Sequence, residues 1–226
     1  MIKGLLYKIF EEKWGKFNNI WLYSDPHFND PDSKHFRGES YPGDEEQLKR
    51  INSKVGKNDA IIFLGDICDI EFIRKVRGYK ILLLGNHDKG ASNYKRLQYK
   101  MKLDEVHTVQ WYDDNKNNIF KIKNEYFFDN RLFDEVYEGP LMLNDRLIIS
   151  HEDIYPLPSY MMNFHGHRHD KPHDVDSQHK NFCAEAIDYC PVSLLKLLKE
   201  GALKDIESIH RHAVDRAVER KSHKRV

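Results

Sequence analysis

Apolar runs that end in short polar clusters recur along the chain. Four runs of the length of a buried strand, at residues 20–24, 60–64, 81–84 and 147–150, each end at such a cluster. The clusters are Asp25-Pro26-His27, Gly65-Asp66-Ile67-Cys68-Asp69, Gly85-Asn86-His87-Asp88 and Ser150-His151-Glu152-Asp153, and a fifth, Gly166-His167-Arg168-His169, follows the mixed stretch 161–165. Because ligands bind at strand ends in an open α/β sheet, we expect these polar side chains to meet at one edge.

The first half of the chain alternates strand and helix patterns. Strands are predicted at 20–24, 60–64 and 79–84, and a short helix near 70–76. Residues 44–55 carry Leu48, Ile51 and Val55 at helical spacing, which predicts a helix there. This order predicts a parallel sheet with right-handed crossovers. Residues 93–102 are predicted to form a basic helix, and residues 1–17 either an edge strand or a short helix.

After residue 106 the pattern changes to short apolar or alternating runs separated by turn signals. These runs, at 106–111, 119–126, 135–143 and 147–150, predict antiparallel strands that form a second sheet packed on the first. Residues 163–165 and 181–186 are further strand candidates, and 191–193 open a Leu-rich helix. The predicted fold is a two-sheet α/β sandwich flanked by helices, in a single domain over residues 1–226, with residues 201–226 as a basic helical C-terminal tail.

Composition narrows the class of protein only moderately. The chain has 226 residues, is 40% hydrophobic and 32% charged, and has a formal net charge of zero, so its overall field does not indicate a polyanionic partner. Its three cysteines form neither a paired metal-binding spacing nor an even disulfide framework. There is no long apolar span for a membrane helix, and we expect a cytoplasmic protein.

The five clusters together supply an unusual set of metal-binding side chains. Asp25 and His27 stand two residues apart, so on extended backbone both can reach one ion. With Asp66, Asn86, His151, His167 and His169, the set holds two Asp, one Asn and four His, too many for one tetrahedral zinc. It suits two divalent ions of intermediate softness, such as Mn, Fe, Co, Ni or Zn. Paired ions of this kind hydrolyse phosphate esters by holding a hydroxide in line with the leaving group.

The order D-x-H, G-D-x-x-D, G-N-H-D, H, G-H-x-H resembles the calcineurin-like metallophosphoesterase family, whose fold has four layers. The resemblance implies one metal held by the residues matching Asp25, His27, Asp66 and His169, and a second held by those matching Asp66, Asn86, His151 and His167. It also implies that His87 protonates the leaving oxygen or stabilises its charge. Asp88 is then expected to orient the His87 imidazole, and Asp69 to lie behind the ligands.

Within this family the chain is most similar to small stand-alone bacterial and phage phosphoesterases, because its first motif reads Asp-x-His-Phe. The Gly-His that usually follows is Asn29-Asp30 here, so loop contacts to substrate do not carry over. Two arginines close in sequence to the site, Arg37 and Arg168, are candidates for holding a substrate phosphate. His165 is expected to be a structural strand residue and Cys68 a packing residue.

These observations favour a metal-dependent phosphoesterase that hydrolyses phosphate esters by metal-bound hydroxide, with phosphodiesters slightly favoured over phosphomonoesters. One alternative is a nuclease on DNA or RNA, which would use the basic helix at 93–102 and residues 210–226, where Lys and Arg outnumber Asp and Glu. Another alternative is a catalytically silent binding scaffold. Metal-dependent hydrolysis of simple esters would separate the enzyme from the scaffold.

Overall fold

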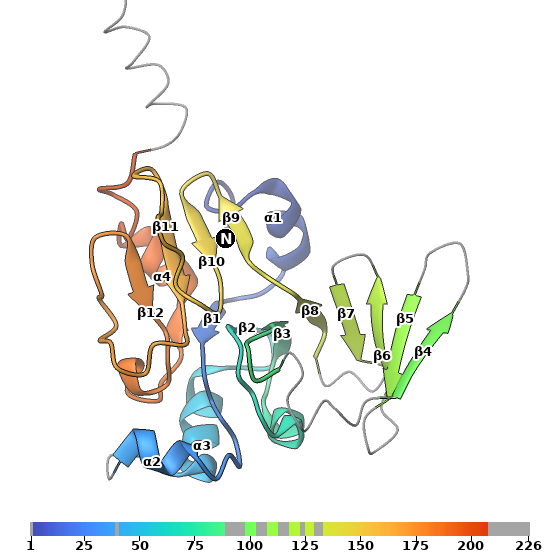
Figure 1. Ribbon diagram of the computed structural model, residues 1–226. Coiled ribbons are helices and arrows are strands. Elements are labelled where there is room, and N and C mark those ends of the chain that lie inside the picture. The colour runs from blue at the N-terminus through green and yellow to red at the C-terminus, as the bar shows by residue number, and fades with distance from the viewer. Residues whose placement is uncertain are drawn as a thin grey trace, which may run out of the picture.

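The computed structural model describes residues 2–38, 41–88, 98–102, 108–112, 118–122, 125–128 and 133–207. Its strands form two β-sheets, which are accompanied by a few short helices (Figure 1). The first sheet has the strand order β13-β1-β2-β3-β8-β7-β6-β5-β4 and the second has the order β12-β11-β10-β9. This is the predicted two-sheet α/β sandwich.

Four parallel strands form the centre of the first sheet: β1 (Ile20–Tyr23), β2 (Ala60–Phe63), β3 (Tyr79–Leu83) and β8 (Glu135–Tyr137). All four residues of β2 are buried, as expected for a strand covered on both faces. The short β13 (Val192–Ser193) pairs antiparallel with β1 at one edge.

An antiparallel meander extends the other side of the first sheet, away from the second sheet (Figure 1). It consists of β4 (Gln98–Lys102), β5 (Thr108–Tyr112), β6 (Asn118–Ile122) and β7 (Glu125–Phe128), and β7 pairs antiparallel with β8.

The second sheet consists of β9 (Leu141–Asn144), β10 (Leu147–Ile149), β11 (Met162–His165) and β12 (His179–Asn181). β10, β11 and β12 are parallel, and only β9 is antiparallel to its neighbour.

One apolar core lies between the two sheets and another covers the outer face of the first. The first core joins residues of both sheets, such as Leu22, Ile62, Ile149 and Phe164, all fully buried. The second core packs α3 (Asp44–Lys54) and the 3-10 helix η2 (Ile70–Lys75) against the sheet, through Ile51 of α3 among others. Helices α1 (Lys8–Trp14) and α4 (Leu194–Lys199) add buried residues to the first core.

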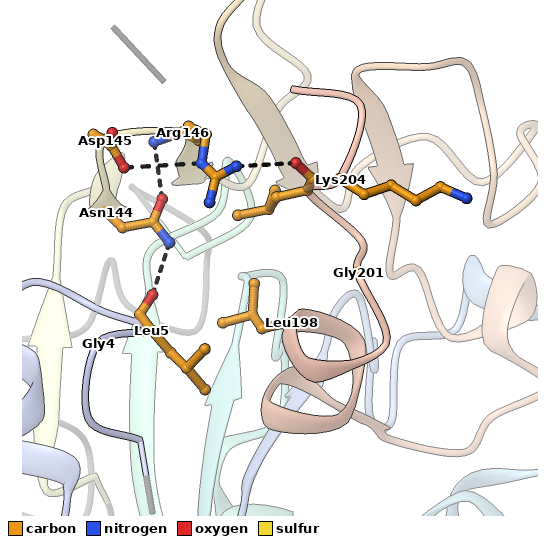
Figure 2. Close-up of a pocket in the computed structure, with 9 residues that line it drawn as sticks. Gly4, Leu5, Asn144, Asp145, Arg146, Leu198, Gly201 and Lys204 are labelled. Atoms are coloured by element: carbon orange, nitrogen blue, oxygen red, sulfur yellow. Dashed lines mark hydrogen bonds and ion pairs between the residues drawn. The ribbon is translucent and has the colours of Figure 1, made fainter. Parts of the chain in front are cut away.

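Short polar contacts tie both ends of the described chain to the turn between β9 and β10 (Figure 2). Asn144 donates to the Leu5 carbonyl at 2.8 Å, and Arg146 donates to the Leu203 and Ile206 carbonyls at 3.2 and 3.1 Å. A small pocket of about 210 Å³ lies between these segments. The contacts give this corner of the molecule a structural role as a joint between the two ends.

The strands predicted at 20–24, 60–64 and 79–84 and the helix predicted at 44–55 are confirmed, and residues 1–17 contain the helix α1 rather than an edge strand. Residues 70–75 form a helix of the 3-10 type. Beyond β13, Ser193 caps α4 by accepting from the Lys196 backbone N–H at 3.0 Å. Residues 201–207 form turns rather than a helix, and residues 208–226 lie outside the described residues.

Several expectations for the second half were wrong. The strands at 108–112, 118–122 and 125–128 extend the first sheet instead of forming a second one, and the predicted run 119–126 contains parts of two strands, β6 and β7. The second sheet is mostly parallel, and β8 is parallel to β3. In the predicted basic helix at 93–102, residues 98–102 form strand β4, where Tyr99 and Met101 alternate with polar residues at the strand period, while 93–97 lie outside the described residues.

None of the described helices combines the length and the apolar character needed to cross a bilayer.

Candidate metal centre

The predicted ligands lie at the ends of five strands that belong to both sheets. Asp25 and His27 follow β1, Asp66 follows β2, and Asn86 follows β3 in the first sheet; His151 follows β10, and His167 and His169 follow β11 in the second. We refer to these seven residues as the candidate metal centre. Because parallel strands end at a common edge, each sheet presents its polar residues on the same side.

Asp25, His27 and His169 form one group of potential ligands. Each offers one ligand atom, and the three atoms all lie within 4.8 Å of one another. Asp25 Oδ1 is 3.5 Å from His169 Nε2 and 3.9 Å from His27 Nε2. Two segments far apart in the sequence therefore point one oxygen and two nitrogens at a common position.

Asp66, His151 and His167 form a second group with the same spacing limit of 4.8 Å. His151 Nε2 lies 3.3 Å from Asp66 Oδ2 and 2.7 Å from Asn86 Oδ1, which brings Asn86 to this group. The same Asp66 Oδ2 lies 3.7 Å from His27 Nε2 of the first group. One oxygen of Asp66 thus lies between the two groups.

The residues present fit divalent cations. The Asp25 Oδ1 atom is buried and accepts no hydrogen bond from any residue that the structure describes. A buried carboxylate oxygen without a donor is costly, and a cation coordinated at that atom would remove the cost. The donor set of oxygens and imidazole nitrogens is also the set that suits intermediate transition metals.

Four of the candidate ligands have left-handed backbone conformations that non-glycine residues adopt rarely. The φ angles are 54° for Asp25, 42° for His27, 54° for Asp66 and 65° for His167. Such conformations cost on the order of 1–3 kcal/mol each and cluster at functional sites, where the surrounding structure imposes them. A Cβ atom at Gly85 would overlap Asp66 Oδ1, so glycine is needed there for the close approach.

Three of the imidazoles are held by an acceptor behind the ring. His27 Nδ1 donates to Asp30 Oδ2 at 2.8 Å, His151 Nδ1 to the Leu64 carbonyl at 2.8 Å, and His169 Nδ1 to Glu185 at 3.2 Å. These bonds leave Nε2 of each ring directed at the centre, the arrangement found around metal-binding histidines. Asp30 and Glu185 were not predicted as site residues, although Asp30 stands three residues after His27.

Arg37 is a buried structural residue and not an exposed phosphate-binding side chain. Its guanidinium contacts Glu185 at 2.5 Å and donates to the backbone carbonyls of Asp25 and Pro26, the latter at 3.0 Å. It also lies over the ring of Tyr41, 4.9 Å from the centroid. The guanidinium therefore links Glu185 to the first motif. The hypothesis that Arg37 binds a substrate phosphate is wrong for this conformation.

Arg168, the other arginine considered for substrate phosphate, forms ion pairs with Asp153 at 3.0 Å and Asp170 at 3.1 Å.

Asp69 caps η2 by accepting from the Glu71 backbone N–H at 3.0 Å and does not contact a candidate ligand in the described contacts. His165 is fully buried within β11, as predicted.

The charges of the ligands are strongly coupled. Burial lowers the pKa of His151, but its hydrogen bond to Asp66 and the charges of Asp25 and Asp66 outweigh burial and raise that pKa to about 9. Burial alone would raise the pKa of Asp66, but the bond from His151 holds it below its usual value. The carboxylates of the centre therefore favour positive charge at the position between them.

His87 and Asp88 follow β3 but have different environments. The His87 ring is exposed and lies edge-on to His27, with centroids 5.0 Å apart, while its backbone N–H donates to Asp66 Oδ1 at 2.8 Å. The buried Asp88 carboxylate accepts the backbone N–H groups of Gly85 and Asp66, both at 2.8 Å, and of Ile67 at 3.1 Å. Asp88 thus fixes two motif loops. We expected it to orient the His87 ring, but its described contacts are with backbone N–H groups. Burial and the Asp66 charge raise its pKa to about 6.

Two buried thiols lie directly behind the candidate ligands. Cys183 Sγ donates to Asp25 Oδ2 at 3.3 Å, and Cys68 Sγ lies 3.4 Å from His27 Nδ1. Burial raises the pKa of both thiols, so they are neutral at ordinary pH. The expectation that Cys68 packs in the interior agrees with its burial.

Comparison with known families identifies the class of protein. The family model for the calcineurin-like phosphoesterase matches residues 19–211, which include both sheets and every residue of the candidate metal centre, and the chain belongs to this family. It is therefore a metal-dependent phosphoesterase, a hydrolase of phosphate esters. No curated protein matches the chain significantly in sequence.

The fold is similar to that of a crystal structure of a protein of unknown function from Aquifex aeolicus. The TM-score is 0.52 at 19% sequence identity, and the match covers 80% of this chain and 98% of the other. At this identity the similarity concerns the fold alone.

Proposed function

We propose that the protein hydrolyses phosphate esters with two divalent metal ions, and that it favours phosphodiesters over phosphomonoesters. The observation that carries the proposal is the position of Asp66 Oδ2, 3.3 Å from His151 Nε2 and 3.7 Å from His27 Nε2. A carboxylate between two groups of ligands is suited to bridge two ions.

In this proposal one ion would be held by Asp25, His27, Asp66 and His169, and the other by Asp66, Asn86, His151 and His167. Such ions bind the phosphoryl oxygens and lower the pKa of the attacking water. Manganese, iron, cobalt, nickel and zinc all suit these donors. Asp30 and Glu185 orient the rings of His27 and His169, so that their Nε2 atoms stay directed at the centre.

His87 is the proposed proton donor. Its exposed ring lies at the edge of the centre, beside His27. A proton that this ring delivers to the leaving oxygen would stabilise the departing alkoxide. A phosphate ester of an alcohol has a poor alkoxide leaving group, which gains most from such a proton, and the preference for diesters over monoesters is the part of the proposal that the ester comparison below tests. Asp88 supports the same loop through the backbone of Gly85.

The test compares a good and a poor leaving group in the wild type and in His87→Ala. Metal-stripped protein is reloaded with Mn, and hydrolysis of bis-p-nitrophenyl phosphate, p-nitrophenyl phosphate and diphenyl phosphate is measured. General acid catalysis contributes about 10²–10⁴-fold, so we expect a loss of at least about 100-fold in kcat for diphenyl phosphate. The loss with bis-p-nitrophenyl phosphate should be smaller, because nitrophenolate leaves without a proton.

Metal binding serves as the control, since His87 is not among the proposed ligands and its removal should leave the affinity for Mn unchanged. Equal losses for both diesters would refute proton donation. A preference for p-nitrophenyl phosphate over the diester would refute the proposed substrate class, and inactivity toward all three esters with every metal would favour a binding scaffold.

The nuclease alternative has weaker support. Of the two basic segments behind it, residues 210–226 and 93–97 lie outside the described residues, and 98–102 form strand β4. The pocket next to the centre is lined by Glu138, Glu152 and Asp153, whose carboxylates would repel further phosphates of a nucleic-acid strand. A small ester suits this surface better.

A further inference from the structure

A pocket of about 510 Å³ opens directly beside the candidate metal centre. Asn86 and His151, two of the proposed ligands, line it on one side, and the segment from Ser150 to Tyr155 and residues 138–140 complete it. An ester group of a phosphate bound at the metals would therefore extend into this pocket. The pocket is large enough for a ligand considerably bigger than a phosphate ion.

Tyr155 presents a large exposed aromatic surface at this pocket. Its exposed fraction is 59%, which is unusual for tyrosine in a protein whose other large aromatic residues are mostly covered in the described part. One face of the ring stacks on His179, with centroids 4.1 Å apart and planes at 25°. The rest of the ring remains open.

The Tyr155 ring is supported by contacts that fix its position. The tyrosine hydroxyl donates to Asp176 at 3.2 Å. His179 beneath it is buried, with Nδ1 2.9 Å from the same Asp176 carboxylate and Nε2 3.1 Å from the Ile154 carbonyl oxygen. An aromatic ring held in this way loses little conformational entropy when a second ring stacks on it.

The charge of the pocket limits what can occupy it. Arg168 neutralises Asp153 through an ion pair at 3.0 Å, but Glu138 and the exposed Glu152 also line the pocket, so the lining is acidic next to a centre that binds phosphate. Carboxylates repel a second phosphate but accept hydrogen bonds from amino groups. A neutral planar ring that bears N–H donors fits these conditions, and a polyphosphate chain does not.

We infer that Tyr155 is a specificity-determining residue, a stacking platform that selects phosphate esters whose ester group carries a planar, uncharged ring such as a nucleobase. The inference rests on the proposed function, since the phosphate of such a substrate is placed at the metal centre. Tyr155 acts on binding and takes no part in the chemical step.

The test compares two ligands that differ only by the base. Adenosine 5′-monophosphate and methyl β-D-ribofuranoside 5-phosphate, which carries a methoxy group in place of the base, are titrated by calorimetry into Mn-loaded protein. We expect the nucleotide to bind about tenfold more tightly, within the range that stacking of a base on an aromatic side chain supports. Tyr155→Ala should reduce the ratio to less than about twofold, and Tyr155→Phe, which keeps the ring, should preserve it.

Tyr7→Ala is the matched control, because Tyr7 is another exposed tyrosine that does not line the pocket. A ratio near one in the wild type, or a ratio that Tyr155→Ala leaves unchanged, would overturn the platform. Hydrolysis of bis-p-nitrophenyl phosphate by the same preparations separates the two proposals. Hydrolysis without base discrimination refutes the platform alone, and base discrimination without hydrolysis under any metal refutes the proposed function alone.

Discussion

At the scale of single residues, the centre depends on side chains that do not themselves face it. Asp30 and Glu185 hold Nδ1 of His27 and His169, and Arg37 joins Glu185 to the backbone of Asp25 and Pro26. Burial would raise the pKa of Glu185, but the bond from His169 and the charge of Arg37 lower it, so it stays ionised. An ionised acceptor is the one that best orients an imidazole ligand.

Replacing these two acceptors by their isosteric amides tests this arrangement. We expect Asp30→Asn and Glu185→Gln each to weaken Mn binding, at the level of about 10- to 100-fold that is typical for such supporting residues. The measurement is competition with a fluorescent chelator. Asp188→Asn is the control, because Asp188 is exposed and pairs only with Arg50 among its described contacts. Unchanged affinity in both amide variants would mean that the rings are positioned by packing alone.

The placement of the candidate ligands at strand ends could be predicted because all but His167 and His169 follow an apolar run, and because the types and order of the residues are specific. The supporting residues could not, since their roles depend on contacts between distant segments: Arg37 and Glu185 are 148 positions apart. Asp88 shows the same limit. Adjacency to His87 suggested a contact with that ring, whereas a carboxylate in this buried position is satisfied by three backbone N–H groups.

At the scale of elements, hydrophobic pattern identified strands more reliably than their partners. β1, β2, β3 and α3 were predicted because their apolar spacing is unambiguous. Alternation after residue 106 also indicated strands, but it contains no information on which sheet they join, and β5–β7 extend the first sheet. In the 98–102 segment basic residues suggested a helix, although Tyr99 and Met101 alternate at the period of a strand.

Glu135 of β8 anchors helix α1 to the first sheet and offers a test at this scale. The carboxylate is buried and contacts Lys13 at 2.9 Å, Trp14 Nε1 at 3.1 Å and the Tyr79 hydroxyl at 2.8 Å. Glu135→Ala should lower the free energy of unfolding by about 3 kcal/mol, since several buried donors lose their acceptor. Urea unfolding measures this effect.

Glu12→Ala provides the comparison for Glu135. Glu12 lies on α1, the helix that Glu135 anchors, and forms an exposed ion pair with Lys8 at 3.6 Å. Its loss should cost less than about 1 kcal/mol. A similar small cost at Glu135 would show that α1 is held by its apolar residues alone.

At the scale of the whole molecule, the candidate metal centre combines residues of both sheets, so metal binding should stabilise their packing. Ligands that bind only the folded state raise stability by about 2.7 kcal/mol at one hundred times their Kd. For a chain of this size we expect Mn at that concentration to raise Tm by about 5–10 °C. Differential scanning fluorimetry of metal-stripped protein measures this shift.

Asp66→Asn should abolish most of that shift, because Asp66 lies between the two groups of ligands. A wild-type Tm that does not respond to Mn, Co, Ni or Zn would contradict metal binding at this position.

The division of the centre between the two sheets also has a consequence for biosynthesis. Asp25, His27, Asp66 and Asn86 leave the ribosome well before His151, His167 and His169, which follow β10 and β11. A nascent chain that has made only the strands β1 to β8 of its first sheet would expose acidic groups at the sheet edge without the imidazoles that complete the ligand set. Metallation is therefore expected to be a late event of synthesis, after the second sheet has formed, and chains arrested before residue 151 would bind cations weakly and with little selectivity.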